Sequence, residues 1–357
     1  MNSEGYEIVH FCPDLRDGVL QVMTHLWGND LENNRSYFEW KYSLNPYVKK
    51  ELGIVALHEN KVVGFRGYFA TRWKLSEPDK KVVILCPGDT CVDPEHRRKN
   101  LSMLMGKLAM EDYAQSYPVF FNFSSNNQST PGYLKMGFAP LVGKGYLNQY
   151  TLWGLIRYIR SSGQKHKQAD IAIPTGDFGD IEVSRYPKPA QMAGLVSGQA
   201  LSDGRIVPDQ DENFFQWRFN NQRKKYVFYF CKKGNEVSGY MVVRVLPKNR
   251  RGFIIDYVAQ DDVSAAKLVS FPIRNKHFNV LSISAYSVTG SMAAALKNFK
   301  FKRHGILRTI EKKIEGEWPL LVRPVKKNPE EQDYFIEGLD IRNPLNWSIK
   351  EICSDGS

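Results

Sequence analysis

The stretch from residue 82 to residue 124 restricts the fold more than any other part of the sequence. VVILCPGDTCVD (82–93) and VFFNFS (119–124) are rich in β-branched and aromatic residues and predict two strands. Between them, apolar residues recur at helical spacing over 101–115, which predicts an amphipathic helix. A strand–helix–strand crossover is right-handed and places its strands parallel in one sheet. We therefore expect an α/β fold (α+β with a mixed sheet).

The flanking sequence supplies further elements for this sheet. Short runs of β-branched, aromatic or alternating residues predict strands at 7–11, 53–59 and 62–76. Helical spacing of apolar residues predicts helices at 13–27, 33–44 and 127–136. Asn45-Pro46 and Gly137 are suitable stop signals for the second and third of these helices.

The second half of the chain loosely repeats the first. SYFEWKYSLN (36–45) resembles NFFQWRFNNQ (213–222), so that Phe38 matches Phe215 and Trp40 matches Trp217. Two later pairs keep the same order: VVGFRGYF with VSGYMVVR, and YLKMGF with LKNFKF. Three ordered matches favour an internal duplication. A polar, aperiodic stretch separates the copies, which predicts domains at 1–160 and 179–357 joined by a linker at 161–178.

Composition narrows the class of protein. The chain has 357 residues, which is longer than one hydrophobic core usually supports. Hydrophobic residues make up 42% of it, too large a fraction for a disordered chain. No apolar run is long enough to span a membrane, and the N-terminus lacks the features of a signal peptide. The five cysteines are scattered, without a CxxC pair. We therefore expect reduced thiols, a cytoplasmic location, no membrane partner and no metal.

The net charge of +11 indicates an anionic partner. Nucleic acid, a membrane surface and small polyanions such as CoA or a nucleotide diphosphate are the three options. The basic residues are spread along the chain, and the densest short cluster, at 96–99, is too short to follow a nucleic-acid backbone. These observations favour a small polyanion and argue against nucleic acid.

The loop at 94–100 is the predicted anion site. It leaves a strand and enters the amphipathic helix directly, so its backbone N–H groups and the positive end of the helix dipole point into one place. His96, Arg97, Arg98 and Lys99 add positive charge where it opposes the helix dipole. A bound pyrophosphate would resolve that conflict.

Here the sequence resembles motif A of the GNAT acetyltransferase superfamily. Val92, Pro94, Arg97, Asn100 and Ser102 occupy its positions, with Asn100 and Ser102 replacing both of the family's glycines. A second family pattern is matched downstream, from Asn126 through Ser129, Tyr133 and Gly137 to Phe138, with Ser129 in place of the family's alanine. The resemblance covers about residues 6–150 and implies two tandem GNAT-like domains, the second degenerate.

The resemblance implies a site for acyl-CoA as co-substrate. The backbones of Cys91 and Val92 are expected to pair with the pantetheine arm, and Asn126 to touch it. Tyr133 is the expected acid for the departing thiolate. Contacts to the coenzyme diphosphate are expected from the loop and first helical turn: Arg97, Arg98, Lys99, Asn100, Leu101 and Ser102. We assign acceptor contacts to Asn122, Trp40 and Arg66.

The base that deprotonates the amine is less defined. Asp89 is our candidate, directly or through water, although a turn or capping role suits it equally well. Glu39 and His25 are alternatives, and some family members use no dedicated base.

The second copy lacks these features. Asp261 and Asp262 stand where the first copy has its basic loop, and two carboxylates would repel a pyrophosphate. Leu296 replaces Tyr133, and Lys300 replaces Gly137. We expect this copy to shape the acceptor pocket. Candidate contacts to an acceptor phosphate are Lys224, Lys225, Arg244, Arg250 and Arg251.

Tandem chains of this kind resemble bacterial nucleotide-sugar N-acyltransferases, which implies a nucleotide-linked amino sugar as acceptor. The type is a dTDP-3-amino-3,6-dideoxyhexose for surface polysaccharide such as O-antigen. The alternatives are a FemABX-like aminoacyl transferase, a non-catalytic acyl-CoA sensor, and an N-acyltransferase that acts on a protein or polyamine. The sequence defines neither acyl length nor oligomeric state.

Overall fold

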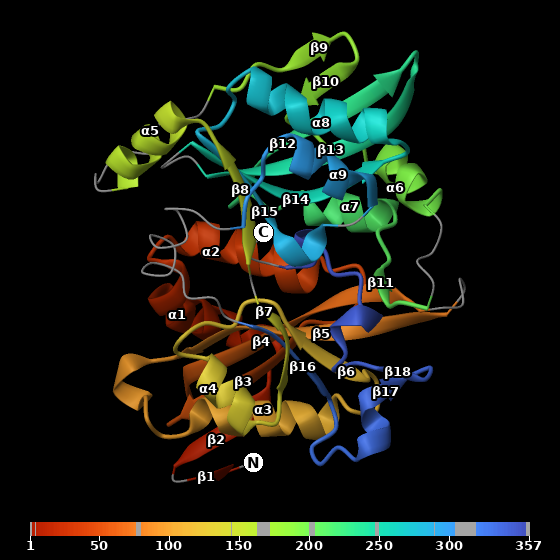
Figure 1. Ribbon diagram of the computed structural model, residues 1–357. Helices are drawn as coiled ribbons and strands as arrows, with labels where there is room; N and C mark the ends of the chain where they lie inside the picture. The colour runs from red at the N-terminus through yellow and green to blue at the C-terminus, as the bar shows by residue number, and fades with distance from the viewer. Residues whose placement is uncertain are drawn as a thin grey trace.

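A computed structural model describes residues 2–3, 5–75, 80–143, 145–162, 172–199, 204–246, 250–288, 290–303 and 319–354. Two mixed sheets with helices on their faces build the molecule (Figure 1). This architecture confirms the predicted fold class of a mixed α/β protein with two sheet bodies.

The first sheet is built mainly by the first half of the chain. Its strands, in spatial order, are β1 (Asn2–Ser3), β2 (Tyr6–His10), β3 (Leu52–His58), β4 (Lys61–Lys74), β5 (Lys81–Val92), β6 (Val119–Asn122), β16 (Pro319–Pro324) and β7 (Ala139–Gly143). A short strand, β11 (Val207–Pro208), also pairs with β4. Neighbours in this sheet are antiparallel except β5 and β6, which are parallel, as the predicted crossover requires.

Helices cover both faces of the first sheet. One face carries α1 (Arg16–Trp27) and α2 (Leu31–Phe38), and the other carries α3 (Leu101–Asp112) and α4 (Thr130–Lys135) (Figure 1). The helix predicted at 33–44 ends early, and one π-helical turn follows it at Glu39–Ser43. That wider turn buries three consecutive side chains, Trp40, Lys41 and Tyr42.

The second sheet has the spatial order β8 (Tyr146–Tyr150), β15 (Val280–Ser284), β14 (Arg251–Ala259), β13 (Glu236–Leu246), β12 (Lys225–Lys233), β10 (Ile181–Ser184) and β9 (Gly176–Phe178). Its helices are α5 (Leu152–Ser162), α6 (Pro189–Ser197), α7 (Glu212–Arg218), α8 (Asp262–Arg274) and α9 (Gly290–Asn298). A small hairpin, β17 (Phe335–Ile336) with β18 (Leu339–Asp340), stands apart from both sheets. Side chains of α8 and α9 form one core with one face of the sheet, and α6 and α7 pack on the other face.

The two sheets exchange a strand. β8 leaves the first half and pairs antiparallel with β15, while β16 leaves the second half and pairs antiparallel with β6. The sheets therefore do not divide at residue 160, and the predicted domain boundaries stay a prediction. Most of the predicted linker, 163–171, lies outside the described residues; its ends belong to α5 and β9.

One hydrophobic core runs between the sheets and joins the halves. At its centre the rings of Trp40 and Trp217 stack 5.4 Å apart, nearly parallel. Each indole N–H donates to the other tryptophan's carbonyl oxygen at 2.7 Å. These are the two tryptophans that the repeat aligns, so the equivalent segments of the halves meet each other reciprocally. This symmetric contact supports the predicted duplication.

Candidate active site

The candidate site begins where β5 and β6 separate. These parallel strands share a register pair only at Leu85 and Phe120, and β5 then continues seven residues further, to Val92, against β4. In that continuation a bulge leaves Asp89 unmatched, with its backbone in the left-handed region at φ 42°. The separation opens a space between the carboxyl ends of two neighbouring strands.

The predicted anion loop lies at one end of this space. Backbone N–H groups from Arg98 to Ser102 donate to no backbone acceptor in the described chain. Arg98 and Asn100 both have positive φ, near 60°, a conformation that turns successive amides toward one side. Asn100 precedes α3 without a side-chain cap on the helix. Five successive amides are thus available to an anion.

A cavity of about 610 Å³ occupies the space. It brings together seven of the residues predicted for the site: Arg66, Asp89, Val92, Ser102, Asn122, Asn126 and Tyr133. They come from β4, β5, β6, the start of α3 and the region of α4, elements that the crossover topology gathers at one edge of the sheet. The sequence prediction therefore selected residues that share one hollow.

Tyr133 places its phenol in this cavity. Its ring is 6% exposed, packs edge-on against Phe138 and lies under the guanidinium of Arg66, 4.9 Å from the ring centre. Within the described chain, its hydroxyl has no hydrogen-bond partner. The group is therefore free to donate to a ligand.

Arg66 is a buried cation in the wall. It is 2% exposed, and one of its terminal nitrogens donates to the Ser102 carbonyl at 3.3 Å. It faces no carboxylate among the described groups that contact it. Its positive charge lies against the Tyr133 ring, where it favours the phenolate that proton donation leaves behind.

Asp89 has several donors on its carboxylate. Trp27 Nε1 donates to Oδ1 at 3.1 Å, and the Tyr42 hydroxyl donates to Oδ2 at 2.8 Å. The fully buried ammonium of Lys41 forms an ion pair with the same Oδ2. Burial raises the pKa of Tyr42 well above its usual value, so that hydroxyl stays a donor. This geometry favours a positioning role for Asp89 over the predicted role as base.

Other predictions are placed elsewhere. The assignment of Trp40 to the acceptor is wrong, because its side chain is 3% exposed and packs in the core between the halves. Leu101 points into the core beneath α3, so only its backbone reaches the site. The Cys91 thiol donates to the Val22 carbonyl, and burial raises its pKa to about 11, so it is no nucleophile. Arg97, Arg98 and Lys99 are exposed outside the cavity wall.

The weaker candidates for the base are also outside the cavity. His25 lies 3.7 Å from Asp93 at the rim of the loop. Neither His25 nor Glu39 is among the residues that line the hollow. Asp89 is the one carboxylate among the described residues of the wall.

The sequence reasoning missed Trp27 and Arg223 in the wall. Trp27 and Tyr37 line the cavity from the first half, and Arg223 enters it from the second half beside Lys224, a candidate contact to an acceptor phosphate. Arg223 lies over the Tyr37 ring at 4.3 Å, and its side chain donates to Asn34. The run Arg223–Lys225 is visible in the sequence, but its position depends on how the halves pack.

Two structural searches bear on the ligands. In the described part of the chain, no group of three or more His, Cys, Asp or Glu side chains is arranged to hold a metal ion. None of the described helices combines the length and the apolar character required to cross a bilayer.

Known proteins give an independent comparison. Residues 14–141 match the family model for the acetyltransferase (GNAT) domain, while no curated protein matches the chain. A GCN5-related N-acetyltransferase from Anabaena variabilis is similar in structure, with a TM-score of 0.60 and 12% identity, over 90% of this chain and 73% of that one.

Two further solved structures are similar over most of the chain. A probable N-acyltransferase from Enterococcus faecalis has a TM-score of 0.56 at 9% identity, covering 90% of this chain and 72% of its own. N-myristoyltransferase from Saccharomyces cerevisiae, solved with bound myristoyl-CoA, has a TM-score of 0.51 at 12% identity, covering 85% and 77%. At these identities the likeness establishes the fold.

The family match and the geometry fall on the same residues. The matched range 14–141 contains the bulge at Asp89, the open amides of the loop and the phenol of Tyr133. Residues 14–141 of this chain are therefore similar to the acetyltransferase (GNAT) domain, and the candidate site lies within them.

Proposed function

We propose that the protein is an acyl-CoA-dependent N-acyltransferase whose reaction takes place in the 610 Å³ cavity of the first half. One observation carries the proposal. The amides from Arg98 to Ser102, which have no backbone acceptor among the described residues, reach the cavity at Ser102, and the Tyr133 phenol lies in the same cavity. An acyl-CoA needs both features: the amides bind its diphosphate, and the phenol protonates its departing thiolate.

The coenzyme fits the residues present. The five amides and the dipole of α3 suit a doubly charged diphosphate, and the exposed cations at 97–99 add long-range attraction. From there the pantetheine arm can follow β5, whose edge beyond Leu85 is no longer paired with β6. That path leads the thioester past Val92 toward Tyr133 and Asp89.

The proposed reaction is a direct transfer. The acceptor amine attacks the thioester carbonyl, a C–N bond forms and the C–S bond breaks. Tyr133 gives its proton to the departing sulfur, and Arg66 stabilises the resulting phenolate. The proton that the amine loses passes to solvent or buffer, because the Asp89 carboxylate is engaged by Lys41, Tyr42 and Trp27.

In this proposal Asp89 fixes the wall of the site. Its ion pair with Lys41 ties the bulge of β5 to the π-helical turn, and its bond to Trp27 holds the end of α1. The pair thereby keeps the cavity open at the point where the strands separate. Asp89 is a positioning residue rather than the proton acceptor.

We further propose that the acceptor is a nucleotide-linked amino sugar, of the dTDP-3-amino-3,6-dideoxyhexose type, acylated in the cytoplasm for surface polysaccharide. Arg223 and Lys224 support an anionic acceptor, because the second half brings both to the cavity opposite the coenzyme loop. The five free cysteines suit a reducing compartment.

A thiol-release assay tests the function. We expect acetyl-CoA or a longer acyl-CoA to release thiol in the presence of amino sugar nucleotides, and less so with polyamines or peptides. Arg97→Glu should raise the KM for the acyl-CoA several-fold, because it reverses charge beside the diphosphate. Lys107→Glu is the matched control, being an exposed cation on α3 outside the cavity.

The assay also separates the proposal from its rivals. Coenzyme binding without thiol release from any amine would indicate an acyl-CoA sensor. The absence of coenzyme binding would contradict the assignment of the loop, and transfer from aminoacyl-tRNA instead would identify a FemABX-like enzyme.

A further inference from the structure

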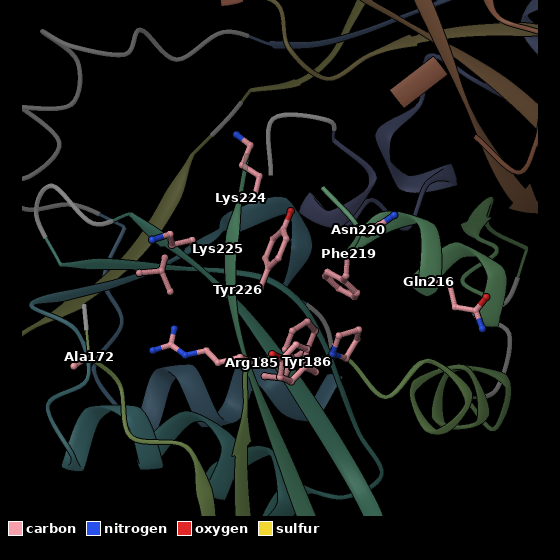
Figure 2. Close-up of a pocket in the computed structure, with 12 residues that line it drawn as sticks. Ala172, Arg185, Tyr186, Gln216, Phe219, Asn220, Lys224, Lys225 and Tyr226 are labelled. Atoms are coloured by element: carbon pink, nitrogen blue, oxygen red, sulfur yellow. The ribbon is translucent and has the colours of Figure 1, made fainter. Parts of the chain in front are cut away.

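A second cavity, of about 700 Å³, lies in the second half beside the proposed active site. It is enclosed by β12, the end of α7, and the segment that follows β10 (Figure 2). Figure 2 shows Lys224 on one side of the hollow and Arg185 with Tyr186 on the other, with Tyr226 and Phe219 between them. Its size is typical of a small-molecule site.

Among the described residues that line this cavity, the charged side chains are basic. Three basic residues, Arg185, Lys224 and Lys225, line it, and the described part of its wall contains no acidic residue. Low-dielectric walls around like charges concentrate the field and attract anions. The cavity therefore favours a ligand with phosphate or another strong anion.

The same cavity offers aromatic surface. Tyr186 is 78% exposed, so a face of its ring is accessible to a ligand. Phe219 lies edge-on to Tyr226 at 5.2 Å and to Phe228 at 4.8 Å, so the rings opposite Tyr186 are held rigidly. A planar ring can stack on such a surface. A ligand that combines an anionic group with a planar ring, such as a nucleoside phosphate, matches these two features.

Lys224 connects this cavity to the active site, because it lines both hollows. The turn that carries it is fixed to both halves. Asn221 accepts from the Arg223 backbone N–H at 3.0 Å, and the Arg223 side chain donates to Asn34 of the first half. Asn34 in turn donates to the Gly28 carbonyl at 2.8 Å. The cation at the junction is thus held in place by packing between the halves.

We propose that this second cavity binds the nucleoside diphosphate of the acceptor. The acceptor then extends past Lys224, so that its amine enters the first cavity next to Tyr133. This inference rests on the proposed function and specifies where the nucleotide portion of the acceptor, which does not react, is held. Two separate diphosphate sites result: the amides at 98–102 for the coenzyme, and the cations of the second half for the acceptor.

Direct binding of dTDP and UDP to the full chain, without acyl-CoA, tests the inference by calorimetry. We expect binding that persists at saturating CoA. Lys225→Gln and Tyr186→Ala should each weaken it about three- to tenfold, by removing a charge or a stacking face. Tyr186→Phe keeps the ring and should bind like the parent protein. Lys233→Gln is the matched control, an exposed lysine at the far end of the same strand.

Three results would overturn the inference. Displacement of the nucleotide by CoA would assign the cavity to the coenzyme. Pyrophosphate that binds as tightly as dTDP, with no effect of Tyr186→Ala, would remove the nucleoside. No binding of either nucleotide would remove the site.

The two proposals fail separately. Coenzyme binding and thiol release with another amine leave the proposed function standing even if dTDP and UDP do not bind. Nucleotide binding without any coenzyme binding would leave the second cavity standing and remove the acyltransferase.

Discussion

The two halves share one architecture at the point where the candidate site of the first half lies. In the first half β5 pairs with β6 at Leu85, and a bulge at Asp89 follows. In the second half β14 pairs in parallel with β15 as far as Ile254, and a bulge at Ile255 follows. In each half the longer strand continues beyond the pairing into a loop and a helix. The strands therefore separate in the same way in both halves.

The helix that follows differs between the halves. Asn100 precedes α3 and leaves the first amides open. Asp261 precedes α8 and accepts from the Ser264 N–H at 2.7 Å, which fills the position that an anion would take. The carboxylate that was predicted to repel a pyrophosphate is thus a helix cap.

The hollow of the second half also differs in chemistry. A cavity of about 860 Å³ lies there, lined by Gln260, Gly290 and Lys350 among others. Lys350 binds the buried Asp256 at 3.0 Å, and Leu296, which the repeat aligns with Tyr133, is core. Each half therefore contains a hollow, but open amides and a phenol are found at the hollow of the first half. Activity in such a fold depends on a few side chains.

Tyr133→Phe should have the largest effect, because it removes from the first half the phenol that the second half lacks. Loss of the proton donor is expected to lower kcat about 10²- to 10⁴-fold, while the affinity for acyl-CoA changes little. Steady-state thiol release and calorimetric binding measure the two quantities. Tyr117→Phe makes the same change in a tyrosine outside the cavity and should be neutral. Unchanged turnover in Tyr133→Phe would remove the tyrosine from the chemistry.

Asp89→Asn tests the buried ion pair. It leaves the fully buried Lys41 without its carboxylate, and the free energy of unfolding should fall by about 3–5 kcal/mol. Asp256→Asn is the counterpart in the second half, and should cost less because the Lys350 side chain is partly exposed. Urea unfolding measures both. Equal losses would show that burial of the lysine is not decisive.

The same variant separates positioning from base catalysis. If Asp89 positions the wall, the double variant Lys41→Met/Asp89→Asn recovers stability and part of the turnover. The acidic limb of the kcat/KM profile then keeps its shape. Loss of that limb in the stable double variant would restore Asp89 as the base.

Acid pH should weaken the second half through His277. Burial lowers the pKa of this imidazole to about 4, with smaller contributions from Arg250 and Arg185, and its Nδ1 shares a hydrogen bond of 2.9 Å with the Tyr229 hydroxyl. The unfolded chain binds the proton near pH 6.5, so stability is full above that value and falls as the pH drops toward 4. We expect a loss of about 2 kcal/mol between pH 7 and pH 5.

His277→Gln removes this proton uptake. In urea unfolding, the stability of the variant should therefore fall by about 2 kcal/mol less between pH 7 and pH 5 than that of the parent protein. Equal pH dependence in the two would mean that the imidazole is accessible to protons in the folded protein.

Local sequence pattern predicted the parts of the site that lie close together in the chain. The crossover at 82–124 is a local unit, so apolar spacing and turn residues were enough to place β5, α3 and β6. Tyr133 follows from the same unit, because α4 packs back onto its strands. The loop at 94–100 lies within this unit, so its position needed no long-range information.

Features that depend on packing between distant segments were not predictable in this way. The exchange of β8 and β16 depends on which sheet offers the better partner, and neither strand's sequence encodes that choice. The role of Trp40 was wrong because an aromatic helix face looks alike in a core and in a pocket. Lys41 reads as an exposed helical lysine, and the π-helical turn buries it.

The smallest expected effect comes from exchanging the residues that precede α3 and α8, Asn100 and Asp261. Asn100→Asp adds the carboxylate of the second half to the loop of the first, where its repulsion of the coenzyme diphosphate should weaken CoA binding about fivefold. Asp261→Asn is the reciprocal change and should leave CoA affinity unchanged. Calorimetry with both proteins gives the comparison. Tighter CoA binding by Asp261→Asn instead would place the coenzyme in the second half, because the removed carboxylate lies at the start of α8.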